Sequence, residues 1–530
     1  MMSPGGTIGP SSWRYLWPAL MVVLVVFPIG IRTNVDGWTA PEIDPPAPRM
    51  HLSDISSGFA RGDARRPFAI FHSMVSAVVY MPYVYVRGGG LPPYHLDDLS
   101  RRVPTLPEEL TVVSRVINLC AAVAVVVLAF RTFLLLTGQL WIAGFVALSV
   151  ALNGNLAFHA SVTYYENSAL AWVFAAAFCF ARLWAREERF AAWLGAFIVF
   201  AALAVSTHER MGGFFLFTIP LACWRVWCLN SVSPRRWRQT AAVVLVAFAA
   251  GGIAFALANN FFGAGVRPAL DYIKYKSGAI HSGGRSAGLW SVLRNQIGAH
   301  GHAVRLVLWN LGGITPVLSA WGVWTLWRTR HWPGLVLLAF PLGYQVLSVG
   351  YVGWTAGRYI LGQTLFVAVF AGFGMAGLAG WPGPLAGPGR QHVQWRWMAM
   401  AAVALIAQGV VLTAVKTADV YYHPRRVLQT VVRDAGEGER ILIQGFDPVS
   451  RAWCERTLGR CSNVSDGQQV CDKANIVIST LGAERCRCTR LLREDVRKPP
   501  RWLTLLVQQG CYLYSDGPAP VTTQWCDVVR

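Results

Sequence analysis

The sequence predicts an all-α, multi-pass membrane bundle of about 11 transmembrane helices, followed by a small C-terminal extramembrane α/β domain. Of the 530 residues, 54% are hydrophobic and only 14% are charged, whereas a soluble domain carries roughly a quarter charged residues. Apolar stretches recur between residues 13 and 415, and a helix of about 20 such residues crosses the hydrocarbon core. After residue 415 the pattern changes to short strands and cysteines.

The apolar stretches define a membrane domain, 1–415, and a tail, 416–530. The expected spans are 13–31, 112–135, 138–157, 166–185, 190–207, 211–229, 240–260, 305–327, 333–351, 357–380 and 397–415. The first resembles a signal peptide, but no small-residue cleavage site follows it, so we interpret it as a retained anchor.

The stretch 68–86, "FAIFHSMVSAVVYMPYVYV", decides the orientation of every later span. If it does not cross and the N-terminus is cytoplasmic, the short outer connections hold only Arg210 and Arg358. The inner connections then hold Arg131, Arg182, Arg186, Arg189, Arg225, Arg235, Arg236, Arg238, Arg328, Arg330, Arg390 and Arg396. This follows the positive-inside rule, so we expect 68–86 to lie along or dip into the outer interface. Loops 32–111 and 261–304 and the tail are then external, and a bacterial cytoplasmic (inner) membrane fits this arrangement.

The tail is predicted to be a Cys-rich α/β domain. "ERILIQGF" and "ANIVIST" are typical of short buried strands, and "HPRRVLQTVVRDAG" and "DPVSRAWCERTLG" of helices. The tail contains Cys454, Cys461, Cys471, Cys486, Cys488, Cys511 and Cys526. An oxidising external side permits disulfides, although an odd number leaves one thiol free or paired elsewhere. The spacing Cys486–Cys488, with no histidine nearby, is unusual for zinc.

Carboxylates at the outer ends of the spans are the candidate catalytic groups. Asp36 and Asp54 lie in the first loop, and each could be either a catalytic base or a solvated loop residue. Glu166 follows "HASVTYY" at the mouth of a span, where an ionised carboxylate is costly unless it is paired or faces water. The alternative is that Glu166 is an acid favoured by the helix dipole.

Cations and possible metal ligands lie at the same ends. "STHERMGG" contains His208, Glu209 and Arg210; with Tyr165, the first two could bind an acceptor or a divalent cation, but two donors do not define a metal site. "GWTAGRYIL" contains Arg358 and Tyr359, where the arginine either extends to the interface or binds phosphate.

The distribution of charge excludes several classes of function. The net charge of +20 is mostly arginine and is explained largely by topology. No motif indicates nucleic-acid binding. The middles of the spans are nearly free of charge, whereas pores and proton relays concentrate ionisable groups there. The pattern therefore favours interfacial chemistry on a lipid-borne substrate.

The layout resembles the GT-C glycosyltransferase superfamily, in its protein O-mannosyltransferase and aminoarabinose-transferase branch. The similarity is carried by the large first outer loop, "SRVIN" at 114–118, Glu166 at the mouth of the fourth span, and the pair Arg358–Tyr359. The family's Asp usually follows the first span closely, often next to a Glu; Asp36 has the better position and Asp54 the better context, and neither has that Glu.

The resemblance implies inverting transfer of a sugar from a polyprenyl-phosphate-linked donor to an acceptor on the outer face. It implies that Asp54 or Asp36 is the base, that Glu166 orients the acceptor or helps bind a cation, and that Arg358 with Arg210 binds the phosphate. The apolar groove between spans would hold the polyprenyl tail. A transporter or flippase, a non-catalytic platform whose tail binds a partner, and a ligase or polymerase of cell-surface glycan remain alternatives.

Overall fold

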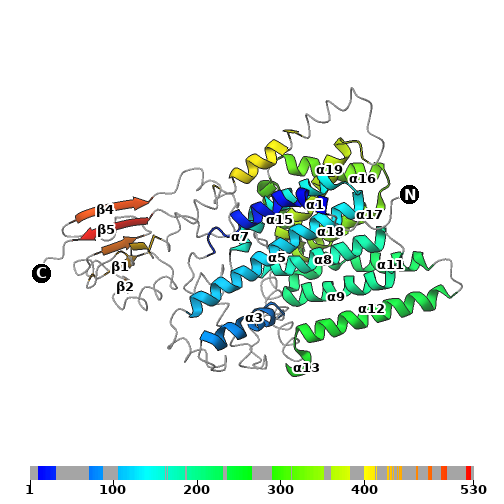
Figure 1. Cartoon of the computed structure of the whole chain (residues 1–530), viewed down its shortest axis with the longest axis horizontal. Coiled ribbons are helices and arrows are strands. Elements are labelled where there is room, and N and C mark those ends of the chain that lie inside the picture. The colour runs from blue at the N-terminus through cyan, green and yellow to red at the C-terminus, as the bar shows by residue number, and fades with distance from the viewer. Residues whose placement is uncertain are drawn as a thin grey trace.

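The structure is a computed structural model, dominated by helices (Figure 1). It describes residues 10–31, 71–87, 106–161, 163, 165–185, 188–230, 235–264, 289–311, 313–350, 360–381, 399–400, 402–411 and, in the tail, 441–444, 461–463, 476–479, 491–497 and 521–526, with a few single residues.

Seven described helical segments are long and apolar enough to cross a membrane, or eight if one bent pair counts as a span. The seven are Glu109–Thr137, Glu166–Ala185, Phe190–Thr207, Glu209–Leu229, Arg236–Ala258, Trp332–Val349 and Leu361–Leu378. Trp13–Val26 and Ala402–Val411 are apolar but shorter. The chain is therefore a multi-pass membrane protein, and the expected total of eleven spans stays a prediction.

The helices follow the predicted stretches in order. They are α1 (Pro10–Val26), α3 (Phe71–Arg87), α5 (Leu106–Thr137), α6 (Leu140–Ala151), α7 (Gly154–Ala160), α8 (Glu166–Ala185), α9 (Phe190–Thr207), α10 (Gly212–Phe215), α11 (Thr218–Leu229), α12 (Arg236–Ala258), α13 (Phe261–Ala264), α15 (Leu289–Leu311), α16 (Ile314–Arg328), α17 (Trp332–Leu335), α18 (Ala339–Tyr344) and α19 (Leu361–Leu378). A short 3-10 turn, η1 (Glu209–Met211), joins α9 to α10, and a π-helical segment, η3 (Gln345–Gly350), follows α18.

Four predicted spans are divided among more than one helix. The stretch 211–229 contains α10 and α11, and 333–351 contains α17, α18 and η3. The stretch 305–327 is divided between α15, which ends at Leu311, and α16, which begins at Ile314, and Gly313 lies between them. The stretch 138–157 is divided into α6 and α7, which are bent by 63°. At this bend the side chain of Asn153 caps α7, because it accepts hydrogen bonds from the backbone N–H groups of Asn155 and Leu156. Its amide nitrogen also donates to Thr364 Oγ1 at 2.8 Å.

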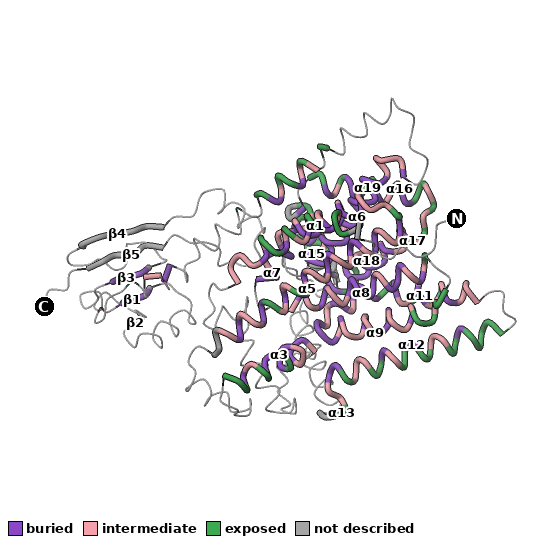
Figure 2. Tube along the Cα trace, in the orientation of Figure 1, coloured by how far each residue is buried: buried purple, intermediate pink, exposed green. Residues whose placement is uncertain are grey.

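The core lies where α5, α8, α9 and α19 pack together (Figure 2). α19 is the most enclosed span, with 83% of its most apolar window buried, whereas only 17% of the α12 window is buried. Glycines allow α16 and α19 to approach closely: a Cβ on Gly374 would overlap the carbonyl of Leu318. Close helix contact through small residues is the usual way to gain packing where no hydrophobic drive acts between helices.

α3 corresponds to the stretch predicted not to cross, and it is not among the candidate spans. Its buried face, which includes His72 and Tyr80, packs on α5 and α9. At its C-terminal end, Arg87 Nε and Nη2 donate to the two oxygens of Glu109 at 3.1 and 2.8 Å. Tyr83 also donates to Glu109, so three hydrogen bonds fix this end of α3 on α5.

The tail contains a five-stranded mixed sheet with the order β2-β1-β3-β5-β4. Its strands are β1 (Ile441–Gln444), β2 (Cys461–Asn463), β3 (Ile476–Ser479), β4 (Leu491–Arg497) and β5 (Val521–Cys526). β2, β1 and β3 pair in parallel, and β5 pairs antiparallel with both β3 and β4. β1 and β3 are the two predicted strands, and both are buried as expected.

Other predictions for the tail fall largely outside the described residues, including its helices and the side chains of its cysteines. The four cysteines that the structure describes with their side chains, Cys120, Cys179, Cys223 and Cys228, are all free. No disulfide is present among the described residues, and tail disulfides remain a prediction from the sequence.

Candidate active site

The buried acid predicted at a helix mouth lies at the start of α8. Glu166 is the first residue of this helix and is only 1% exposed. The N-terminal end of a helix favours a negative charge, but burial of a carboxylate is costly without polar surroundings. The groups around Glu166 therefore decide whether this position can serve chemistry.

Three aromatic rings meet at Tyr165, the residue before Glu166. The ring of Tyr165 lies 6.0 Å from that of His72, on α3, and 5.1 Å from that of His208, at the end of α9. His72 is 3% exposed and His208 is 4% exposed. The start of α8, the end of α9 and the buried face of α3 thus form one polar group, His72–Tyr165–His208, and Glu166 is the next residue after Tyr165 in the chain.

The turn η1 adds two more predicted residues to this end. His208 Nδ1 lies 3.3 Å from the backbone N of Arg210 and 3.4 Å from Glu209 Oε2. A nitrogen that accepts a hydrogen bond carries no proton, so the backbone contact corresponds to neutral His208, and the contact with Glu209 becomes an ion pair only when His208 is protonated. The carbonyl of Arg210 accepts a hydrogen bond from Ser348 Oγ, at 2.6 Å, which joins this turn to η3.

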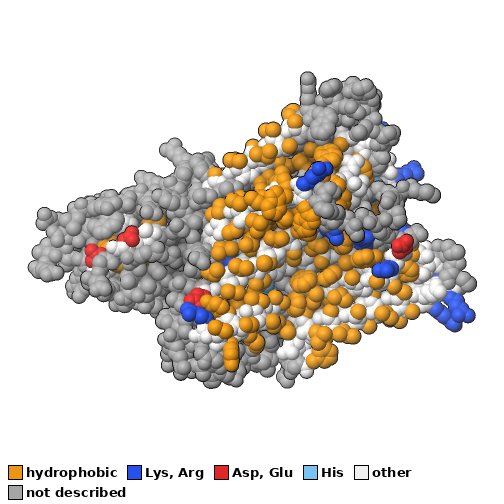
Figure 3. All heavy atoms as spheres, in the orientation of Figure 1, with side chains coloured by type: hydrophobic (Ala, Val, Ile, Leu, Met, Phe, Trp, Pro, Cys, Tyr) orange, Lys and Arg blue, Asp and Glu red, His pale blue; other side chains and the backbone are white. Residues whose placement is uncertain are grey.

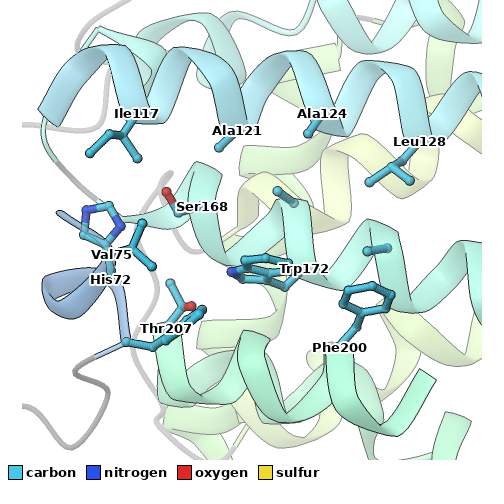
Figure 4. A pocket seen from close by; sticks show the side chains of 13 residues that line it. His72, Val75, Ile117, Ala121, Ala124, Leu128, Ser168, Trp172, Phe200 and Thr207 are labelled. Carbon is cyan, nitrogen blue, oxygen red and sulfur yellow. The ribbon is translucent and has the colours of Figure 1, made fainter. Parts of the chain in front are cut away.

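An apolar cavity of about 370 Å³ opens next to the polar group (Figure 4). It lies between α3, α5, α8 and α9, with His72, Ser168 and Thr207 at one end and Leu128 and Phe200 at the other. Its long walls are made of small and aromatic side chains: Ala121, Ala124, Ala171, Ala175 and Trp172.

Aromatic contacts shape the floor of this cavity. The Trp172 ring stacks on Phe200 with ring centres 5.9 Å apart and also lies 5.9 Å from Phe71 of α3. At the polar end, Ser168 Oγ donates to Asn118 Oδ1 at 3.0 Å. Ser168 lies two residues after Glu166, so the polar end of the cavity and the buried carboxylate share the first turn of α8.

Arg115, in the predicted "SRVIN" segment, joins α5 to the end of the first described segment. Its Nη1 donates to the carbonyl of Ile31 at 2.7 Å, and the side chain is only 2% exposed. Ile31 is five residues before Asp36. The arginine thus has a positioning role that the sequence did not suggest.

Four predicted site residues lie outside the described residues: Asp36, Asp54, Arg358 and Tyr359. Among the residues that the structure describes, no group of three or more His, Cys, Asp or Glu side chains could hold a metal ion. His208 and Glu209 are adjacent as predicted, and binding of a divalent cation stays a prediction.

Basic side chains are distributed unevenly along the bundle (Figure 3). On the face shown in Figure 3, most of the described Lys and Arg side chains gather near α11, α12 and α17, far from α3. Arginines there lie over aromatic rings: Arg225 over Trp184, Arg236 over Trp227 and Arg328 over Trp324, all within 5.6 Å. Tryptophan is enriched at both membrane–water interfaces, so these contacts fit an interfacial position for this end of the bundle.

Comparisons with known proteins identify only distant structural similarity. No family model and no curated protein matches the chain. Solved structures that are similar include ArnT from Cupriavidus metallidurans bound to undecaprenyl phosphate, with a TM-score of 0.44, and ArnT from the same organism in the apo state, with a TM-score of 0.42. Both are 12% identical, and both matches cover 97% of this chain and 98% of the other. Because both TM-scores are below 0.5, we base the function on the residues of this chain.

Proposed function

We propose that this protein is a membrane glycosyltransferase that moves a sugar from a polyprenyl-phosphate-linked donor to an acceptor on the outer face. The observation that carries the proposal is the apolar cavity with His72, Ser168 and Thr207 at one end, together with a buried acid, Glu166, two residues before Ser168 in the first turn of α8. A lipid-linked sugar has the same two parts, an apolar chain and a polar head joined at one point. Water-excluded sites with fixed polar groups are the usual setting for charge stabilisation in catalysis.

The proposed reaction is an inverting displacement at the anomeric carbon. A base, Asp54 or Asp36, takes the proton of an acceptor hydroxyl as its oxygen bonds to the anomeric carbon. The bond from that carbon to the phosphate oxygen breaks, and polyprenyl phosphate leaves with the bonding electrons. Arg358 and Arg210 stabilise the charge on the leaving phosphate, while Glu166 orients the acceptor.

The remaining predicted residues surround this centre in supporting roles. Tyr165, His208 and Glu209 are proposed to bind the acceptor or, with Glu166, a divalent cation, and Tyr359 accompanies Arg358 at the phosphate. The ring contacts of Tyr165 with His72 and His208 support one shared pocket rather than separate surface positions.

The occupant of the cavity is tested with a photoactivatable polyprenyl phosphate and the full chain in lipid nanodiscs. Ala124 lines the cavity, so Ala124→Phe should lower cross-linking by about tenfold, since overpacking costs roughly 1–3 kcal/mol. Ala242→Phe, on the exposed side of α12, is the matched control and should leave cross-linking unchanged. Equal cross-linking in both variants would place the lipid elsewhere.

The chemistry is tested by sugar release from a panel of polyprenyl-phosphoryl glucose, mannose and arabinose. Glu166→Gln keeps the size of the side chain and removes its charge, so turnover should fall by about 100-fold through lost positioning, while cross-linking of the lipid persists. Full turnover in Glu166→Gln, or in the Asp36→Asn/Asp54→Asn double variant, contradicts the assigned roles. Lipid movement across the bilayer without sugar release would instead support the flippase alternative.

A further inference from the structure

A second polar group lies between α15, η3 and α19 and is not used by the proposed chemistry. His300 is on α15, Gln345 is the first residue of η3, and Gln363 is near the start of α19. Gln363 is 5% exposed, whereas His300 and Gln345 are half-buried. None of the three was singled out in the sequence, because an isolated amide or histidine in an apolar stretch gives no motif.

These side chains form a hydrogen-bonded series with one direction. Gln363 Nε2 donates to Gln345 Oε1. The Gln345 amide then offers its nitrogen to His300 Nδ1, at 2.6 Å. With Nδ1 accepting, the proton of a neutral imidazole is on Nε2. The series therefore ends in a donor, His300 Nε2–H, on one side.

The other end of the series is an acceptor. Gln363 Oε1 is buried and has no hydrogen-bond partner among the described residues. A purely structural network between helices would be expected to satisfy its buried acceptor, because buried polar groups are nearly always hydrogen-bonded. An unused acceptor at one end and a donor at the other suit a ligand with several hydroxyl groups, since each hydroxyl can both donate and accept.

The position of this group relates it to the candidate active site. Ser348, one turn along η3 from Gln345, donates to the carbonyl of Arg210, the residue two after His208. A Cβ on Gly213 would overlap Ser348 Oγ and would lie 3.0 Å from Tyr344 Cα, so a glycine is needed for this close approach. The Gln345–Gln363 hydrogen bond joins η3 to α19, the two described elements that precede and follow residues 351–359 in the sequence.

We propose that His300, Gln345 and Gln363 form a subsite for a neutral, hydroxyl-rich ring, which is the sugar of the donor or of the acceptor. The inference rests on the proposed function, since it assigns the sugar-recognising part of the same site. Side-chain amides and a neutral imidazole suit hydroxyl groups, whereas a phosphate is better matched by arginine. In this assignment the arginines bind the phosphate and the amides bind the hydroxyl groups.

The test uses chemical modification of histidine, which does not depend on turnover. The full chain in lipid nanodiscs is treated with diethyl pyrocarbonate, and modification of His300 is measured by mass spectrometry. His302, two residues away and exposed, is the internal control. The probes are undecaprenyl phosphate, undecaprenyl-phosphoryl-glucose and -mannose, and methyl α-glucoside and α-mannoside.

The probes distinguish the two sources of the sugar. Protection of His300, but not of His302, by a sugar-bearing lipid and not by undecaprenyl phosphate identifies the donor sugar. Protection by a free methyl glycoside identifies the acceptor. Equal protection by undecaprenyl phosphate and the sugar-bearing lipids, or protection by no probe, overturns the subsite.

A variant pair checks that protection comes from the amides. Gln363→Met keeps the length of the side chain and removes its polar atoms, and it should raise the half-protecting concentration by about tenfold, the effect of losing one neutral hydrogen bond. His302→Ala should leave it unchanged. If Gln363→Met fails to fold, Gln345→Met is measured instead, and an unaltered half-protecting concentration in the variant that folds refutes the assignment.

The same experiment separates failure of the subsite from failure of the proposed function. Radiolabelled undecaprenyl phosphate that binds without any sugar-dependent protection refutes the subsite and leaves the function standing. Absence of binding by every lipid probe refutes the proposed function. Protection by a methyl glycoside in that case would show a carbohydrate site on a protein with another activity.

Discussion

Replacement of Gly322 or Gly374 by alanine should loosen the helix pair that positions Gln363. A Cβ on Gly322 would overlap the carbonyl of Phe370 and lie 2.7 Å from the backbone N of Gly374. A Cβ on Gly374 would overlap the carbonyl of Leu318 and lie 2.9 Å from its carbonyl carbon. The obstructing atoms are backbone, so no side-chain rotation relieves the overlap, and α16 and α19 must move apart.

The magnitude follows from two opposing terms. Overpacking of a close contact costs about 1–3 kcal/mol, whereas glycine to alanine inside a helix gains about 1 kcal/mol of intrinsic propensity. Each single variant should therefore lose up to about 2 kcal/mol, and the double variant less than the sum, because one separation of the helices makes room for both methyl groups.

Unfolding in mixed micelles of mild detergent and dodecyl sulfate, followed by circular dichroism, measures these differences. Gly252→Ala is the matched control: it lies in α12, and nothing lies within 4 Å of its added Cβ, so it should be neutral or stabilising. If Gly322→Ala and Gly374→Ala are as stable as Gly252→Ala, or if their effects add fully, the inferred contact between α16 and α19 is wrong.

Three further predictions concern α3 and the orientation of the chain. Glu109→Gln removes the ion pair between Arg87 and Glu109, whose side chains are 45% and 27% exposed. Docking of α3 should therefore weaken by less than about 1 kcal/mol, measured as modestly faster maleimide labelling of an Ala77→Cys variant. Labelling as fast as in unfolded protein would contradict this. Burial lowers the pKa of His72 from 6.5 to about 4, so docking of α3 should be strongest above pH 6.5 and weaken as the pH falls towards 4. His72→Asn should remove this pH dependence of Ala77→Cys labelling. An unchanged pH dependence would show that His72 is not its source. Glu188 lies in the connection between α8 and α9, so a Glu188→Cys variant should react with an impermeant maleimide only from the cytoplasmic side. Reaction from the outer side would contradict the predicted orientation.

The order of the helices was predictable because hydrophobicity and length alone define a membrane helix. The breaks were not. The bend at Asn153 is accompanied by a hydrogen bond to Thr364, which belongs to a span distant in the sequence. The stretch 305–327 is divided at a pair of glycines within an otherwise continuous apolar pattern. The strands β1 and β3 were visible as short buried runs, whereas β4, with "REDVR", is too polar to indicate a strand outside its pairing with β5.

The sequence predicted site residues where a single residue type is unusual for its depth in the membrane. It did not predict those that depend on contacts between distant elements. Glu166 is noticeable because an acid at a span end is rare, and "THER" because its polar residues are contiguous. His72 lies within the stretch 68–86, which the sequence predicts only to be interfacial, and its contact with Tyr165 requires α3 to pack on α5 and α9. The cavity was equally hidden, since alanines such as Ala121 and Ala124 indicate space only once Trp172 and Phe200 are seen opposite them.

The arrangement of the two polar groups also explains why a site for the proposed substrate needs few charged residues. In the proposed function, the cavity beside Ser168 would hold the apolar chain and the amides of Gln345 and Gln363 would hold the hydroxyls, so neither part calls for an ion. Charge is required only where the phosphate leaves and where a hydroxyl loses its proton, between these two places. The hydrogen bond from Ser348 to the carbonyl of Arg210 joins η3, which carries Gln345, to the turn that follows His208. A substitution at Ser348, such as Ser348→Ala, should therefore lower turnover without weakening retention of the bare lipid phosphate, and a selective loss of lipid binding would show that the two polar groups act independently.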